Sequence, residues 1–175
     1  YAWSPDEREI AFTTKVGHDQ AWHPNNDIYT VPVAGGTPSN QTADLRGADQ
    51  TPLYSPDGRY LAFLSLERAG FEADRTRLMV KDRQTGQVRE VTRDWDYPIG
   101  EYAWAPGGPD LFAVADRHQR NVLLHIVFQT GEVHQILTDR NAGQLTLAAS
   151  PNPVMVAFVS DAIHRPAEVF TWTLA

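Results

Sequence analysis

The sequence predicts an all-β fold, a partial β-propeller of about four four-stranded antiparallel blades. Three observations predict it: a proline-centred turn that recurs four times, strand-like runs around and after each turn, and no convincing helical spacing of apolar residues. The turns are centred on Pro5, Pro56, Pro106 and Pro151, so successive copies are 51, 50 and 45 residues apart. Self-similarity at a period of about 40–50 residues is typical of propellers and related repeat arrays.

The first two strands of each repeat flank the proline turn. The second copy is the clearest, Tyr54-Ser55-Pro56-Asp57-Gly58-Arg59-Tyr60-Leu61-Ala62-Phe63. Proline presets φ at the second position of a tight turn, Asp or Asn suits the next position, and Gly is tolerated at the position after that. The apolar or aromatic residue before the turn and the apolar run after it therefore predict an antiparallel strand pair.

A third strand follows in every repeat and a short fourth strand in three of them. The third strands are rich in Ile, Val, Tyr, Leu and Phe, which strands favour. We expect them at Asp27–Val33, Thr76–Asp82, Asn121–Phe128 and Ala167–Leu174. Glycine-containing turns then lead to the expected fourth strands, at Ser39–Thr42, Val88–Thr92 and Val133–Leu137. Four strands per repeat make one propeller blade.

We therefore expect one propeller segment, with blades at residues 1–42, 43–92, 93–137 and 138–175 and no outer strand in the last blade. Because the sequence begins in a first strand and ends in a third strand, it is expected to be a fragment of a larger propeller. A closed four-bladed ring is the less favoured alternative. The unpaired blade edges would tend to pair with another chain, so self-association through them is also expected.

Composition narrows the function classes. The 175 residues are 42% hydrophobic and 21% charged, ordinary for a soluble globular protein. A net charge of −7 argues against nucleic acid as a partner. No apolar run approaches the length of a membrane helix, so no membrane partner is expected. The chain has no cysteine, and neither a cofactor nor a metal is predicted. Cytoplasmic and periplasmic or secreted locations both remain open.

Candidate binding residues gather in the irregular connections. In a blade, the tight turns lie at one end and the longer connections at the other, and loops held by a rigid scaffold usually carry function. We expect the substrate-binding residues there: Phe71, Glu72, Asp74 and Arg75 in the second blade, beside Trp95, Asp96 and Tyr97 in the connection to the third. His18 and His23 lie in another long loop, but their spacing matches no common metal-ligand pattern.

The Ser-Pro-Asp-Gly-x-x-(Leu/Ile)-Ala-Phe repeats resemble the propellers of the prolyl oligopeptidase family of serine peptidases, and also TolB-type propellers. The segment Arg68-Ala69-Gly70-Phe71-Glu72-Ala73-Asp74-Arg75 is similar to one in the acylaminoacyl-peptidase and dipeptidyl-peptidase 5 branch. Asp94-Trp95-Asp96 and Arg165-Pro166-Ala167-Glu168-Val169 resemble the later blades of that branch. Ala-Pro-Gly-Gly in the third repeat and Ser-Pro-Asn-Pro in the fourth depart from the pattern.

The resemblance implies a two-domain serine peptidase whose propeller caps an α/β-hydrolase domain of the same polypeptide and admits only short peptides. No Gly-x-Ser-x-Gly nucleophile motif occurs in this chain, so it is expected to be non-catalytic by itself. Glu72, with Asp74 second, is the candidate that holds a substrate's α-ammonium group, and Arg75 is the candidate for a substrate carbonyl. In the alternative, Glu72, Asp74 and Arg75 pair with one another and only shape the loop. The alternative function is a TolB-like protein-interaction propeller with no enzymatic partner domain.

Overall fold

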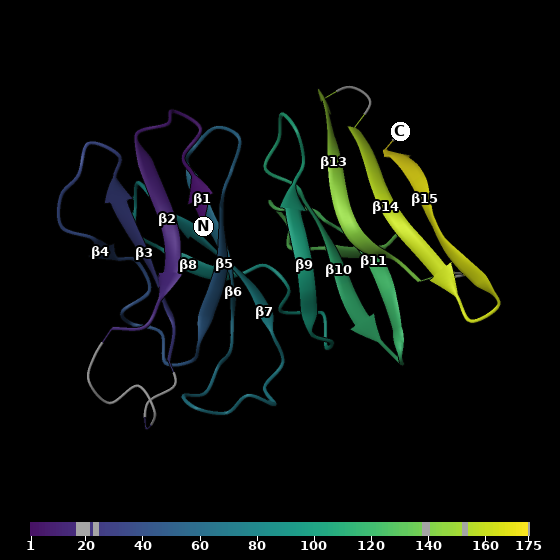
Figure 1. Cartoon of the computed structure of the whole chain (residues 1–175), viewed down its shortest axis with the longest axis horizontal. Helices are drawn as coiled ribbons and strands as arrows, with labels where there is room; N and C mark the ends of the chain where they lie inside the picture. Colours follow the sequence, from purple (N-terminus) through teal and green to yellow (C-terminus); the bar gives the residue numbers. More distant parts are fainter. Residues whose placement is uncertain (17–21, 23–24, 138–140, 152–153, 175) are drawn as a thin grey trace. The chain divides into compact units, whose positions relative to one another are not determined.

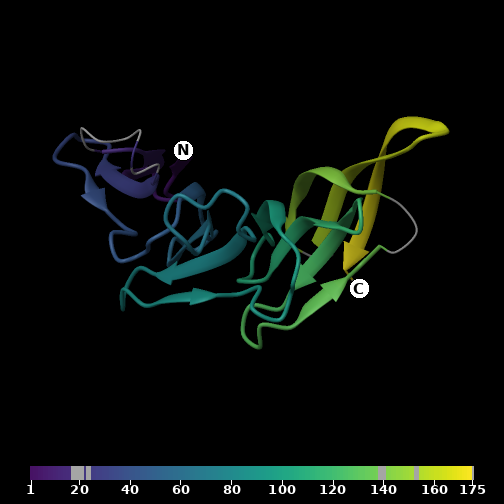
Figure 2. The ribbon, with the colours of Figure 1, turned by 90° about the horizontal axis from the view of Figure 1, so that it is seen from below.

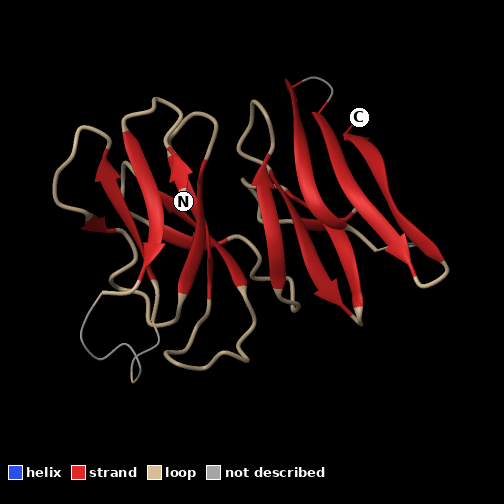
Figure 3. Cartoon of the chain, in the orientation of Figure 1, coloured by secondary structure: helices blue, strands red, loops and turns tan. Residues whose placement is uncertain are grey.

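A computed structural model of the chain describes residues 1–16, 22, 25–137, 141–151 and 154–174. All the regular secondary structure in these residues is β-strand (Figure 3). The strands fall into two compact units, Tyr1–Val91 and Thr92–Ala175, and each unit holds two antiparallel sheets (Figure 1). The all-β prediction is therefore confirmed.

The first unit contains two four-stranded meanders. One sheet consists of β1 (Ala2–Trp3), β2 (Glu9–Thr14), β3 (Asp27–Pro32) and β4 (Ser39–Asn40). The other consists of β5 (Asp49–Tyr54), β6 (Tyr60–Ser65), β7 (Arg77–Asp82) and β8 (Val88–Glu90). Each strand is hydrogen-bonded to the next in the chain, as in a propeller blade.

The second unit contains one four-stranded and one three-stranded sheet. The four-stranded sheet consists of β9 (Ile99–Trp104), β10 (Leu111–Arg117), β11 (Arg120–Ile126) and β12 (Val133–Gln135). The other consists of β13 (Gly143–Pro151), β14 (Val154–Ala162) and β15 (Arg165–Leu174), with β14 in the middle and β15, yellow in Figure 2, at one edge. That the whole chain forms one propeller segment with the expected blade boundaries stays a prediction.

Each unit has its own apolar core. In the first unit, Ile28, Leu61 and Phe63 are almost fully buried in a cluster that residues of both sheets form. In the second unit, Phe112 and Val156 are fully buried in an equivalent cluster. Burial of side chains of this size stabilises a fold by about 1.5–3 kcal/mol each.

The first two proline turns are held by the same set of side-chain hydrogen bonds. In the first copy the Ser4 hydroxyl donates to Asp6 over 2.6 Å, and the same carboxylate accepts the Arg8 backbone N–H. In the second copy Ser55 donates to Asp57 over 2.5 Å, and Gly58 takes the left-handed conformation at φ 71°. These bonds stabilise the ionised carboxylates and lower the pKa of Asp6 and of Asp57.

Two of the third strands begin earlier than the sequence predicts. β11 begins at Arg120 and β15 begins at Arg165, and each follows a two-residue turn. Strand pairing continues to these turns, with Arg117 opposite Arg120 and Ala162 opposite Arg165.

Candidate functional site

The loop between β6 and β7 carries four of the predicted binding residues. Backbone hydrogen bonds from Phe71 N–H to the Arg68 carbonyl and from Asp74 N–H to the Phe71 carbonyl fold it into consecutive turns. Gly70 supplies the left-handed conformation that this path needs, at φ 66°. The loop therefore has a defined shape and presents most of its side chains to solvent.

Asp74 closes this loop by pairing with Arg68. Its carboxylate accepts hydrogen bonds from the Arg68 backbone N–H at 2.8 Å and from Nε at 2.7 Å, and it forms an ion pair with the Arg68 Nη2. These bonds lower the pKa of Asp74. The same guanidinium lies 3.9 Å from the centre of the Phe71 ring. Asp74 is therefore occupied in holding the loop.

Arg75 pairs with a residue outside the loop. Its Nη2 donates to the Glu90 Oε1 over 2.7 Å, and Arg77 approaches the other oxygen of Glu90 at 4.0 Å. This ion pair lies outside the group of Glu72, Asp74 and Arg75, whose members the alternative expects to pair with one another. Glu90 is the last residue of β8 and lies opposite Met79 of β7, four positions along the chain from Arg75. Asp74 and Arg75 thus take part in two separate ion pairs, with Arg68 and with Glu90.

Glu72 takes part in neither ion pair. Its side chain is exposed, and within the described part of the chain no hydrogen bond or ion pair involves its carboxylate. Phe71 beside it is 43% exposed. Glu72 therefore places an unneutralised carboxylate next to an exposed aromatic ring, a combination that suits a cationic group attached to an apolar chain.

The connection that precedes β9 carries the other predicted residues. Trp95 is only 9% exposed and its ring lies 5.6 Å from that of Tyr97. Tyr97 in turn shares a 2.9 Å hydrogen bond with His118. Arg117 lies over both aromatic rings, at 5.6 Å from Trp95 and 5.5 Å from Tyr97. Asp96 is exposed, so of the three predicted residues in this connection Asp96 and the half-buried Tyr97 reach the surface.

The loop between β6 and β7 belongs to the first unit, and the connection before β9 belongs to the second. That the predicted residues of these two segments lie close together stays a prediction. His18 and His23 lie outside the described residues. Among the residues that the structure describes, no cluster of three or more potential metal-binding side chains occurs, and no helix is present that would cross a membrane.

Arg68 and Glu90 organise the loop but were not among the predicted site residues. Arg68 stands at the start of the quoted Arg-x-Gly-Phe-Glu-Ala-Asp-Arg segment, so a charge six residues before Asp74 was the available signal. Glu90 carries no such signal, because its position beside Arg75 follows from the pairing of β7 with β8.

No family model matches the chain. Over 138 residues, 78% of this chain, it is 34% identical to dipeptidyl-peptidase 5 of Porphyromonas gingivalis, of which the match covers 20%. It is 24% identical over 157 residues to dipeptidyl-peptidase 5 of Arthroderma otae, of which the match covers 22%. The chain thus spans about a fifth of the length of these curated relatives.

Solved structures share its fold. The TolB protein of Acinetobacter baumannii matches with a TM-score of 0.71 at 23% identity, over 98% of this chain and 40% of TolB. The acylaminoacyl peptidase of Pyrococcus horikoshii matches with a TM-score of 0.68 at 14% identity, over 94% of this chain and 24% of the peptidase. The partial-propeller prediction is confirmed by these likenesses, which at such identities concern the fold alone.

Proposed function

Because the chain is a homologue of the dipeptidyl-peptidase 5 proteins and has the blade fold of prolyl oligopeptidase family propellers, we propose that it is the non-catalytic propeller segment of a serine peptidase. In this role it caps an α/β-hydrolase domain of the same polypeptide and restricts access to short peptides. A Gly-x-Ser-x-Gly motif elsewhere in the gene would support the proposal. Its absence from the gene would favour the TolB-like interaction propeller.

Glu72 anchors the substrate's α-ammonium group in this proposal. The observation that carries it is the difference between Glu72 and its neighbours, since Asp74 and Arg75 are each engaged in an ion pair while Glu72 is not. A carboxylate free of intramolecular partners forms a charge-assisted hydrogen bond to an ammonium group without first breaking another. Fixing the amino terminus would set which peptide bond reaches the catalytic serine.

The test is Glu72→Gln in the full-length peptidase. Hydrogen bonds to charged groups contribute about 1.5–3 kcal/mol, so kcat/KM on a dipeptide substrate with a free amino group should fall by about 10–100-fold. The same substrate with an acetylated amino group should be cleaved equally by both forms. Glu67→Gln removes another exposed carboxylate of the same loop and serves as the matched control.

Two results would count against the anchor. One is an equal loss of kcat/KM in the Glu67 and Glu72 variants, which would indicate a general effect of loop charge. The other is a fall in thermal stability of Glu72→Gln with normal kinetics on the free-amino substrate, which would indicate that Glu72 only shapes the loop.

A further inference from the structure

The second unit contains a cavity that the predicted site does not include. Its volume is about 530 Å³, within the range of about 300–1,000 Å³ that is usual for ligand pockets. It lies where β11, β14 and β15 meet their two-residue turns. The side chains that matter for its chemistry are Gln119, Arg120, Asn141, Asp161, His164 and Arg165.

Positively charged side chains outnumber carboxylates among the described residues that line this cavity. Arg120 and Arg165 contribute two positive charges, and Asp161 is the one carboxylate among the described lining residues. Asp161 accepts a 3.3 Å hydrogen bond from the Asn141 side-chain amide. In the described ranges, neither arginine takes part in an ion pair. A locally positive cavity in a chain of net charge −7 has the sign that attracts an anion.

Arg165 lies beside an aromatic ring, but one of its N–H groups has no hydrogen-bond partner among the described residues. It begins β15, and its guanidinium carbon lies 5.7 Å from the centre of the Phe170 ring. Its Nε is buried and has no hydrogen-bond partner among the described residues. Buried donors are normally paired, so an unpaired one next to a cavity indicates that a bound group could supply the acceptor.

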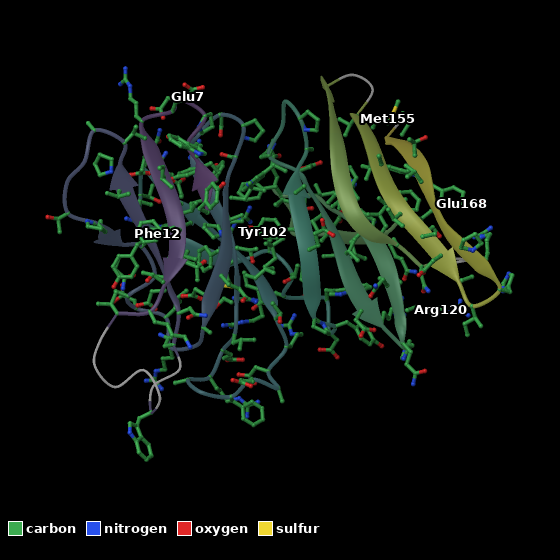
Figure 4. The ribbon with its side chains drawn as sticks, in the orientation of Figure 1. Glu7, Phe12, Tyr102, Arg120, Met155 and Glu168 are labelled. Atoms are coloured by element: carbon green, nitrogen blue, oxygen red, sulfur yellow. The ribbon has the colours of Figure 1, made fainter. Side chains whose placement is uncertain are left out.

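Arg120 is placed by a tight hairpin turn. His118 and Gln119, which join β10 to β11, have φ values of 51° and 65°, the left-handed conformation that both central residues of a two-residue type I′ hairpin turn adopt. The turn therefore fixes the position of Arg120 at the start of β11. Figure 4 shows Arg120 at the lower end of this hairpin, with its side chain extending from the turn.

We infer that this cavity binds the carboxylate of a peptide. The planar guanidinium groups of Arg120 and Arg165 match the two oxygens of a carboxylate better than an ammonium group would. The carboxylate comes from a peptide's C-terminus or from an acidic side chain. Taking the ligand to be a peptide rests on the proposed function, whereas the preference for an anion rests on the cavity itself.

The test is a calorimetric titration of the 175-residue chain with N-acetyl-tetraalanine and with its C-terminal amide. The acetyl group removes the ammonium that Glu72 is proposed to hold, so the result is independent of the Glu72 experiment. The free acid should bind at least about 10-fold more tightly than the amide, as expected for one charge-assisted hydrogen bond. Arg120→Gln and Arg165→Gln should each remove most of this difference.

Arg93→Gln is the matched control, because Arg93 is exposed in the same unit and does not line the cavity. It should leave the affinity for the acid unchanged. Arg120 is also exposed, so its variant keeps the test valid even if Arg165→Gln does not fold.

The outcomes separate clearly. Tighter binding of N-acetyl-Ala-Glu-Ala-amide than of its Gln counterpart, abolished by Arg120→Gln, would support the inference and assign the carboxylate to a side chain. Equal binding of acid and amide peptides would overturn it. So would an equal effect of the Arg93 and Arg120 variants, or binding of inorganic phosphate with no binding of either peptide acid.

Discussion

Asp49 should make the first unit less stable as the pH rises through the weakly acidic range. It is the first residue of β5 and is fully buried. It pairs across the sheet with Ser65, which pairs in turn with Arg77. Neither oxygen of its carboxylate has a hydrogen-bond partner among the described residues. The nearby Ser65 hydroxyl donates to the Leu66 carbonyl instead.

This environment disfavours the ionised form. Burial raises the pKa of Asp49 from 3.8 to about 6, and the carboxylate of Asp27 adds to the rise. The hydroxyls of Ser65 and Thr42 and the guanidinium of Arg77 oppose it only in part. A pKa raised by about 2 units corresponds to about 3 kcal/mol between the two protonation states, at about 1.4 kcal/mol per unit.

The sign follows from proton linkage. Because the pKa of Asp49 is higher in the folded chain than in the unfolded chain, the folded state binds the proton more tightly. The free energy of unfolding therefore receives the full contribution of the neutral carboxyl below the unfolded pKa of 3.8. It falls by about 3 kcal/mol as the pH rises to 7.

The assay is urea denaturation of the wild type and of Asp49→Asn at a series of pH values from about 4 to 8. Asparagine has a similar shape but no charge, so the stability of the variant relative to the wild type should increase by about 3 kcal/mol across this range. All other titrating groups are common to both proteins and cancel in the difference.

A flat difference curve for Asp49→Asn would refute this reasoning. It would mean that the Asp49 carboxylate is hydrated or paired in solution and titrates as it does in the unfolded chain. A curve of opposite slope would mean that the ionised form is favoured in the folded state, as it is for Asp74.

Two further substitutions test the packing of the first unit. In Gly47→Ala the new methyl carbon would lie 2.1 Å from the Leu66 carbonyl oxygen, so the free energy of unfolding should fall by about 1–3 kcal/mol; unchanged urea denaturation would contradict this contact. Tyr54→Phe removes the 2.6 Å hydrogen bond from the Tyr54 hydroxyl to Glu9 and should cost about 1–2 kcal/mol. Arg83 still pairs with Glu9 over 2.7 Å, so a much larger loss would show that the whole network had collapsed.

Much of the fold was predictable because its signals are local. A Ser-Pro-Asp turn forms its own hydrogen bonds within a few residues, as Ser4 with Asp6 and Ser55 with Asp57 show. The third strands were predictable from their content of Ile, Val, Tyr, Leu and Phe, and the fourth strands from the glycine-containing turns that precede them. The starts of β11 and β15 were not predicted, because polar residues continue in a strand wherever a neighbouring strand offers ladder hydrogen bonds.

The candidate site was predictable only in part. Local charge and the motif identified Glu72, Asp74 and Arg75, but ion pairing is decided by which side chains come within reach after folding. The partner of Arg75 is Glu90, and that distance is set by the register of β7 with β8. The sequence therefore indicated which segment is rich in charged residues, whereas the tertiary structure determined which of these residues form ion pairs.

By itself, the sequence determined that the chain forms four proline-turn hairpins, that its strands are built into meanders, and that one charged loop carries an exposed aromatic residue. Only the tertiary structure decided that the Asp49 carboxylate is buried without a hydrogen-bond partner among the described residues, and that Arg120 and Arg165, from different sheets, line one cavity. The physical reason is range: turn and strand preferences act over a few neighbouring residues, whereas burial and electrostatic pairing depend on groups that only packing brings together.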